Sequence, residues 1–228
     1  MSSTLGQSIA QWMASPAGGW RCCKCSAAID HPGACDACGE AWERSRVEQT
    51  RSGARATIPS HFRWATFESA ELGQRCGADG PRMARAALDA LRCGVSESVV
   101  FMGPARAGKT SLACAVLRCA IDTLPHLGYS ARFVSASLLG RSRRDGRMGE
   151  TPILVSQAVQ SSFLLLDDVG QEVESDVIRE VIQARHDADR PMLVTTFFGE
   201  SAIAQRYGGG IAGRLFERSA VVDVTGLL

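Results

Sequence analysis

Residues 103–110 read Gly103-Pro104-Ala105-Arg106-Ala107-Gly108-Lys109-Thr110 and fit the pattern G-x-x-x-x-G-K-[ST]. In this pattern the backbone N–H groups of a glycine-rich loop surround a phosphate chain, and the lysine reaches the terminal phosphates. The apolar run 99–102 predicts a buried strand before the loop, and the pattern at 110–124 predicts a helix after it. Because strand, loop and helix come in the required order, we expect a nucleotide-binding protein.

Strand and helix patterns alternate on both sides of this loop. A helix is expected at 81–93, and strands are expected at 99–102, 132–135, 163–167, 192–196 and 221–224. Continuous apolar strands between helices predict a parallel five-stranded sheet covered on both faces. The expected fold class is therefore α/β, with a phosphate-binding loop.

Length and composition limit the possible classes. The chain of 228 residues is long enough for one α/β core and a small appendage. Its formal net charge of +1 gives no overall attraction to nucleic acid. No apolar stretch approaches the roughly 20 residues that span a bilayer, and the N-terminus has no secretory signal pattern. We therefore expect a cytoplasmic protein without a membrane partner.

The predicted strand at 163–167 ends in two carboxylates, Asp167 and Asp168. After a phosphate loop, an apolar strand with this ending is typical of a Walker B motif. Asp167 is expected to hold Mg²⁺ through water, with Thr110 as the second protein ligand. Asp168 is expected to orient and deprotonate the water that attacks the γ-phosphate of ATP.

Two cysteine pairs near the N-terminus predict a metal site. The pairs Cys22-x₂-Cys25 and Cys35-x₂-Cys38 present four thiolates, which suits one tetrahedral structural Zn²⁺. Cys23 or His31 could replace one ligand, and a redox pair is the alternative for either pair alone. A segment this short cannot fold on apolar burial, so the metal would hold it.

Three regions are expected along the chain. Residues 1–43 would form an N-terminal zinc-binding module for partner binding, with a short amphipathic helix possible at 8–14. Residues 44–57 are rich in arginine and poor in apolar residues, which favours an exposed linker. Residues 58–228 would form the nucleotide-binding domain.

From Ile58 to Gly226 the chain resembles the DnaC-type helicase loader family and its relative, the IstB transposition ATPase, within the AAA+ class. The resemblance rests on Ile58-Pro59-x-x-Phe62-x-x-Ala65-Thr66-Phe67, the phosphate loop, Leu165-Leu166-Asp167-Asp168-Val169-Gly170-x-Glu172, Arg185, residues 191–196, Gln205-Arg206-Tyr207-Gly208 and Ile211-Ala212-Gly213-Arg214-Leu215. It implies a AAA+ domain with Mg²⁺-dependent ATPase activity.

The resemblance also assigns residues. Thr196 would end the sensor-I strand, and Arg214 would be an arginine finger that reaches the nucleotide of a neighbouring subunit or a partner ATPase. The implied catalytic residues are Lys109, Asp167, Asp168 and Arg214. The residues expected to contact ATP are Gly103, Pro104, Ala105, Arg106, Ala107, Gly108, Lys109, Thr110, Ser111, Asp167 and Thr196.

The chain departs from the family in two places. Phe197 stands where relatives have asparagine, and no arginine helix of the sensor-II type follows residue 224. Thr195 or Thr196 could take the place of that asparagine, but slow turnover is expected, because a phenyl ring can neither polarise water nor contact phosphate. The segment 141–147 lies where the family contacts single-stranded DNA. We expect it to be a glycine-containing loop whose four arginines suit weak, salt-sensitive contact without sequence specificity, and a solvated loop is the alternative.

The first functional hypothesis is a phage- or plasmid-like helicase loader. It would bind a hexameric replicative DNA helicase through the N-terminal region and place it on single-stranded DNA during initiation of replication. The alternatives are an IstB-like transposition ATPase that binds duplex DNA, a nucleoside or nucleotide kinase, and a nucleotide-gated adaptor without useful hydrolysis.

Overall fold

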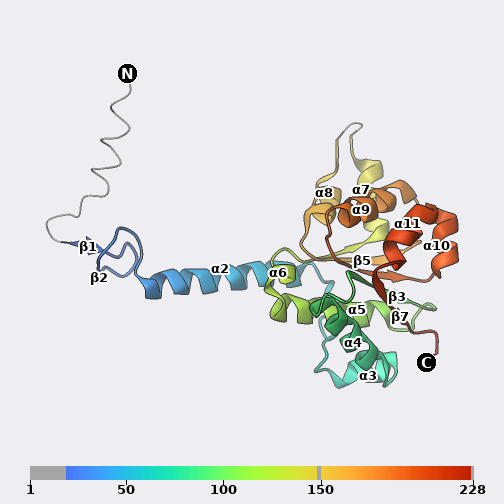
Figure 1. The fold of residues 1–228 in the computed structure, drawn as a ribbon, viewed down its shortest axis with the longest axis horizontal. Helices are drawn as coiled ribbons and strands as arrows, with labels where there is room; N and C mark the ends of the chain where they lie inside the picture. Colours follow the sequence, from blue (N-terminus) through green and yellow to red (C-terminus); the bar gives the residue numbers. More distant parts are fainter. Residues whose placement is uncertain (1–18, 148–149, 227–228) are drawn as a thin grey trace. The chain divides into compact units, whose positions relative to one another are not determined.

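The computed structural model describes residues 19–147 and 150–226. The chain divides into two compact units, residues 1–49 and 50–228, which are described separately (Figure 1). The amphipathic helix considered at 8–14 lies outside the described residues. The boundary between the units falls within the helix α2 (Asp36–Ala56).

The N-terminal unit has almost no apolar core. Strands β1 (Trp20–Arg21) and β2 (Ala28–Ile29) form a short antiparallel hairpin, which is followed by the start of α2. Among its described residues, 19–49, only Cys22 is buried. Apolar burial therefore cannot stabilise this unit, and a cross-link or a metal must do so.

The segment 44–57 was expected to be an exposed linker, and the structure makes it helical as far as Ala56. Ion pairs one turn apart stabilise its start: Arg44 lies 3.3 Å from Glu40, and Arg46 lies 2.8 Å from Glu43. Much of the segment is exposed, so its helix has no apolar stripe that the sequence could reveal, and ion pairs between side chains support it instead. Its role as a linker stays a prediction.

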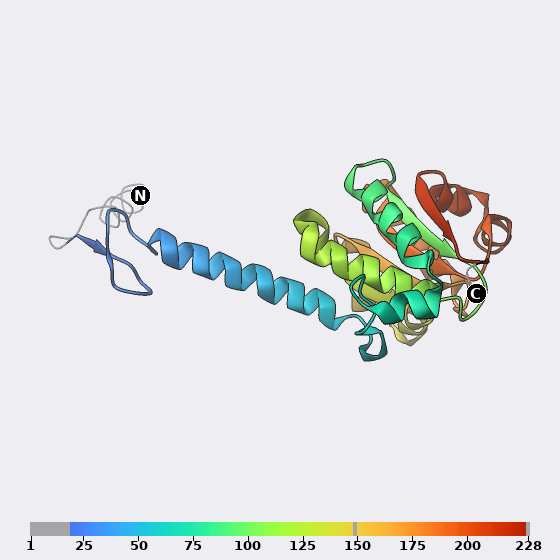
Figure 2. The ribbon, with the colours of Figure 1, turned by 90° about the horizontal axis from the view of Figure 1, so that it is seen from below.

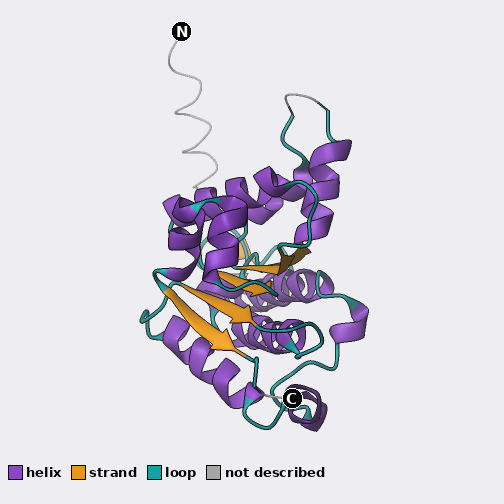
Figure 3. Ribbon diagram, turned by 90° about the vertical axis from the view of Figure 1, so that its right-hand side faces the viewer, coloured by secondary structure: helices purple, strands orange, loops and turns teal. Residues whose placement is uncertain are grey.

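The second unit is built on a parallel five-stranded sheet, as predicted. The strands are β3 (Ser98–Met102), β4 (Arg132–Ser135), β5 (Leu164–Val169), β6 (Met192–Thr196) and β7 (Ser219–Asp223), in the order β4-β5-β6-β3-β7. Each lies within two residues of its expected position. Helices cover both faces, as Figure 3 shows in purple around the orange strands.

Alternate residues of the strands face opposite layers of helices. In β3, Val99 and Phe101 pack into one core cluster, and Val100 packs into the other. The first layer contains α3 (Ala70–Cys76), α4 (Gly80–Arg92), α5 (Lys109–Thr123) and α6 (Pro125–Gly128). Within it α4 and α5 lie side by side, in green in Figure 2.

Within the described residues, five helices form the second layer. They are α7 (Ala136–Asp145), α8 (Ile153–Gln160), α9 (Ser175–Asp187), α10 (Glu200–Tyr207) and α11 (Gly209–Phe216). Among the described residues, no helix has the combined length and apolar character that crossing a membrane requires.

A fully buried arginine joins three segments of this layer. The guanidinium of Arg185, on α9, donates to the carbonyl oxygens of Ala158 at 2.7 Å, Ser161 at 2.8 Å and Pro191 at 2.6 Å. Burial lowers the pKa of Arg185 to about 9, so the side chain stays charged at neutral pH. These hydrogen bonds hold the end of α8 and the start of β6 against α9.

Replacing Arg185 by methionine is expected to lower the free energy of unfolding by about 2–4 kcal/mol, because several buried carbonyls would lose their donor. Urea unfolding of the full chain measures the change. Arg179→Met is the matched control, since Arg179 is exposed on the same helix and should change stability by less than about 0.5 kcal/mol. Equal stability of the two variants would contradict the bracing role of Arg185.

Candidate nucleotide site and cysteine cluster

A cleft of about 490 Å³ opens beside the glycine-rich loop. One side is formed by the loop and the start of α5, and Asp168 also lines it. Aromatic and basic side chains complete the lining: His61, Phe62, Trp64 and Arg75. The guanidinium of Arg75 lies 4.5 Å from the centre of the Trp64 ring. Two planar side chains therefore lie in the same cleft as the glycine-rich loop. Sequence reasoning missed Trp64 and Arg75, because no local pattern places either residue beside a loop that lies far along the chain.

The loop adopts a conformation that requires glycine at two positions. Gly103 has a φ of +143° and Gly108 a φ of +80°. A Cβ on Gly108 would lie 2.4 Å from the Cys76 sulfur, and one on Gly103 would lie 2.8 Å from Val224. The spacing of glycines in the motif therefore matches both the backbone and its close neighbours.

Lys109 lies at the first position of α5, where the free N–H groups of the helix favour an anion. Its ammonium donates to the carbonyls of Gly103 at 2.9 Å and Pro104 at 2.7 Å. Burial lowers the pKa of Lys109, and the nearby carboxylates of Asp168 and Asp167 oppose this shift. Ser111 follows in the same turn and lines the cleft.

The structure brings Thr110 and Asp167 together, as the magnesium prediction requires. The Thr110 hydroxyl donates to Asp167 Oδ1 at 2.8 Å, and the Thr195 hydroxyl donates to the same oxygen at 2.7 Å. Thr195 also accepts the Asp168 backbone N–H at 2.9 Å. Asp167 is buried, which raises the pKa of its carboxyl. A carboxylate and a hydroxyl at this separation could bind one Mg²⁺.

Thr195 and Thr196 have different surroundings. The Thr196 hydroxyl donates to the Val169 carbonyl at 2.9 Å and accepts the Phe198 N–H at 3.0 Å, so it links the last residue of β5 to the loop after β6. Thr195 is therefore the threonine that contacts Asp167 and Asp168, whereas the sequence favoured Thr196 as the residue that contacts ATP. Phe197 is 53% exposed, with its ring edge-on to Phe198.

Arg214 lies on α11, near the amino-terminal ends of the strands, whereas the phosphate loop lies at their carboxyl-terminal ends. It lines a small hollow with Ser98 and Ser219, the first residues of β3 and β7, whereas the loop follows the last residue of β3. Five residues of strand separate these two ends by about 15 Å. Arg214 therefore lies away from the nucleotide site of its own chain.

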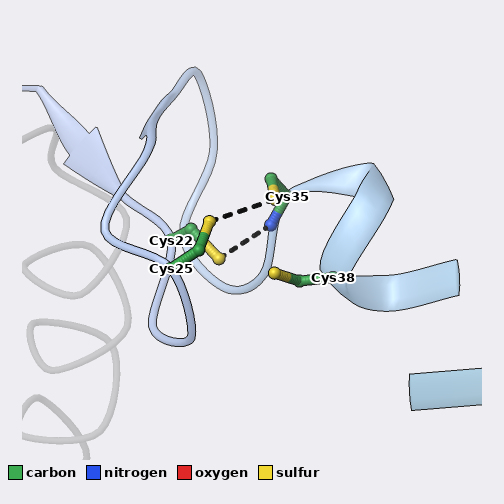
Figure 4. A group of neighbouring side chains, drawn as sticks. All are labelled: Cys22, Cys25, Cys35 and Cys38. Carbon is green, nitrogen blue, oxygen red and sulfur yellow. Dashed lines mark hydrogen bonds between the residues drawn. The ribbon is translucent and has the colours of Figure 1, made fainter. Parts of the chain in front are cut away.

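The four predicted zinc ligands converge, as Figure 4 shows. The sulfur atoms of Cys22, Cys25, Cys35 and Cys38 all lie within 4.8 Å of one another. Four sulfurs placed tetrahedrally around zinc at about 2.3 Å would be about 3.8 Å apart, so the group could hold this ion. Among the described residues, neither Cys23 nor His31 belongs to the cluster.

Backbone N–H groups favour the thiolate in this cluster. The amide of Cys35 donates to the Cys22 sulfur at 3.3 Å, and the amide of Lys24 does so at 3.4 Å. These donors, that of Cys35 first, lower the pKa of Cys22 to about 6. The hydrogen bond with Cys25, and then the other sulfurs, raise the pKa of Cys38 to about 12. A thiolate at Cys22 thus disfavours ionisation of Cys38 beside it, and a bound cation would remove this repulsion.

The basic segment 141–147 is mostly helical, which corrects the expectation of a loop. Arg141, Arg143 and Arg144 lie on α7, and Arg143 is paired with Glu180 of α9. Arg141, Arg144 and Arg147 are exposed. Three of the four cations are therefore on the surface, and one braces two helices.

Comparisons with known proteins identify the fold and the family. The model of the family described as IstB-like ATP binding protein matches residues 40–205. The crystal structure of the DnaC helicase loader has a TM-score of 0.58 at 19% identity, over 72% of this chain and 99% of that chain. DnaI has a TM-score of 0.53 at 19% identity, over 69% and 95%.

AMPPCP-bound DnaA from Aquifex aeolicus has a TM-score of 0.50 at 20% identity, over 71% of this chain and 50% of that one. No curated protein sequence matches the chain. At such identities the likeness of the solved structures concerns the fold, whereas the family model matches the greater part of the sequence.

Proposed function

Because this chain belongs to the IstB-like ATP-binding family of AAA+ ATPases, we propose that it is an ATP-dependent loader of a hexameric replicative DNA helicase. In this proposal the second unit binds and hydrolyses ATP, and the N-terminal unit binds the helicase. The observation that carries it is the four-cysteine cluster in a second compact unit outside the nucleotide-binding fold, which would be the unit that binds a partner. The likeness of that fold to the DnaC helicase loader supports the same role.

ATP would occupy the cleft beside the glycine-rich loop. Its phosphates would lie on the N–H groups of residues 103–111 and on Lys109, and its base would lie near Trp64. Mg²⁺ would be held by Thr110 and Asp167, where it would neutralise phosphate charge, and Asp168 would orient the attacking water. Arg214 would act on the nucleotide of a neighbouring subunit.

Zinc would be structural in the N-terminal unit. Four thiolates leave no position for water, so the ion would hold the hairpin to the start of α2 and take no part in hydrolysis. Single-stranded DNA would make weak contacts that depend on salt, through the exposed arginines Arg141, Arg144 and Arg147.

The second candidate function is an IstB-like accessory ATPase of transposition that binds duplex DNA. The family model itself favours it, since that model describes IstB-like proteins. Both candidates share the ATPase unit, so the partner of the N-terminal unit discriminates between them.

Capture on an immobilised hexameric replicative helicase tests the proposal. With an ATP analogue present, Cys25→Ser is expected to reduce capture of the full chain at least about tenfold, because loss of a ligand unfolds the zinc unit. Cys23→Ser is the matched control, since Cys23 is exposed and outside the cluster, and it should bind as the wild type does. Equal capture of both variants would reject the N-terminal role, and coating of duplex DNA without helicase affinity would favour the second candidate.

A further inference from the structure

A buried glutamate joins the loop after β5 to the end of α10. The side chain of Glu172 is fully buried, and four donors converge on its carboxylate. Gly170 N–H donates to Oε2 at 2.9 Å. Oε1 accepts the Tyr207 hydroxyl at 2.6 Å and the Arg206 Nε and Nη2 at 3.2 and 3.0 Å. Arg206 Nη2 also donates to the Glu172 carbonyl.

These hydrogen bonds are better explained by the need to fix the position of α10 than by a contribution to the free energy of unfolding. A buried ion pair adds little net stability, because both groups lose their hydration. A buried carboxylate that loses a donor, however, carries a large penalty. The donors on α10 must therefore keep their places relative to the loop that contains Gly170.

The loop on one side of Glu172 is tied to the nucleotide site. Asp168 lines the cleft and has a φ of +55°, and Gly170 follows with a φ of +104°. A Cβ on Gly170 would lie 2.2 Å from the Phe198 ring, so this loop packs directly on the one after β6. The backbone between Asp168 and Glu172 thus has little freedom to shift alone.

The helix on the other side of Glu172 leads to Arg214. Tyr207 ends α10, Gly208 turns the chain with a φ of +95°, and α11 begins at the next residue. Ile203, Tyr207, Ile211 and Leu215 are buried together in the second core cluster, which packs α10 and α11 as one body. A shift at Tyr207 would consequently move the helix that bears Arg214.

We propose that Glu172 is a positioning residue, whose carboxylate sets the place at which α11 presents Arg214 to a neighbouring subunit. The inference rests on the proposed action of Arg214 on a neighbour's nucleotide. Glu172 would act only through Arg206 and Tyr207, and it would leave nucleotide binding by its own chain unchanged.

Mixing two full-length variants on single-stranded DNA isolates this role. Arg214→Ala subunits keep a nucleotide site and lack the arginine, whereas Lys109→Ala subunits lose the site and keep Arg214. ATP turnover in the mixture then depends on Arg214 supplied by the Lys109→Ala subunit. Glu172→Gln is added to that donor subunit, which hydrolyses nothing itself.

We expect the Glu172→Gln donor to restore between about 10- and 100-fold less turnover than the Lys109→Ala donor, as displacement of an active group by about 1 Å would cause. A donor with Glu174→Gln, the same change two residues along, should restore turnover fully. Tyr207→Phe in the Lys109→Ala subunit removes one of the four hydrogen bonds to the Glu172 carboxylate. It should lower the restored turnover by less than Glu172→Gln does.

The outcomes separate the inference from the function. Full restoration by the Glu172→Gln donor overturns the inference and leaves the proposed function standing. Failure of the Lys109→Ala donor itself overturns the action of Arg214 on a neighbour, and the inference with it. With Lys109 intact, Glu172→Gln should bind a fluorescent ATP analogue within about twofold of the wild type. If the Glu172→Gln variant does not bind the analogue, the test uses the Lys109→Ala subunit with Tyr207→Phe instead. Full restoration of ATP turnover by that subunit overturns the inference.

Discussion

Replacement of Lys109 by alanine is expected to lower ATP affinity at least about 100-fold and to remove measurable turnover. The ammonium lies at the start of α5, among carbonyls that phosphate oxygens would replace as its partners. Two charge-assisted hydrogen bonds of about 1.5 kcal/mol or more each amount to at least 3 kcal/mol, and each 1.4 kcal/mol is a factor of ten. Titration with a fluorescent ATP analogue measures the affinity.

The chain provides a matched control for this change. Lys24 is the only other lysine in the sequence, it is exposed, and it belongs to the other unit. Lys24→Ala keeps the backbone N–H that donates to Cys22, so ATP affinity should not change. If Lys109→Ala bound ATP as tightly as Lys24→Ala, the phosphate loop would not be the site.

Removal of zinc is expected to unfold the N-terminal unit and to leave the ATPase unit folded. Structural zinc in small peptides contributes on the order of 10 kcal/mol at neutral pH, and the described part of this unit buries only Cys22. A strong chelator should therefore open residues 19–38 to proteolysis, with one zinc released per chain. Metal analysis and limited proteolysis measure the two effects.

The cysteine neighbours Cys22 and Cys23 offer the control. Cys22→Ser should lose zinc and become protease-sensitive, whereas Cys23→Ser should keep both properties, because Cys23 is exposed and outside the cluster. ATP binding should be the same in both variants. A Cys22→Ser chain that resists proteolysis would show that something other than a metal holds this unit.

Much of the ATPase fold could be predicted because its signals are local. Apolar runs of four or five residues specify the buried strands, and β4 and β6 were expected with the bounds that the structure has. Gly103 and Gly108 could be predicted for the same reason, since a motif of eight residues contains both the loop and its lysine. The family match supports this part of the sequence as a whole.

What the sequence concealed depends on neighbours far along the chain. The contact of Thr195 with Asp167 follows from the pairing of β6 with β5, and no local pattern gives that order. Trp64 lines the cleft beside Arg75 of α3, and the partners of Glu172 lie 34 and 35 residues later. The helix α2 was missed for another reason, because charges rather than an apolar face support its exposed turns.

The opposite placement of Lys109 and Arg214 has a consequence for symmetry. If Arg214 serves a neighbouring chain, each chain offers two unlike surfaces, one at each end of its strands. A contact between unlike surfaces is head-to-tail, and its repetition gives a closed ring or an open helical filament. The last chain of an open filament would keep one incomplete ATP site, so the filament would have two different ends.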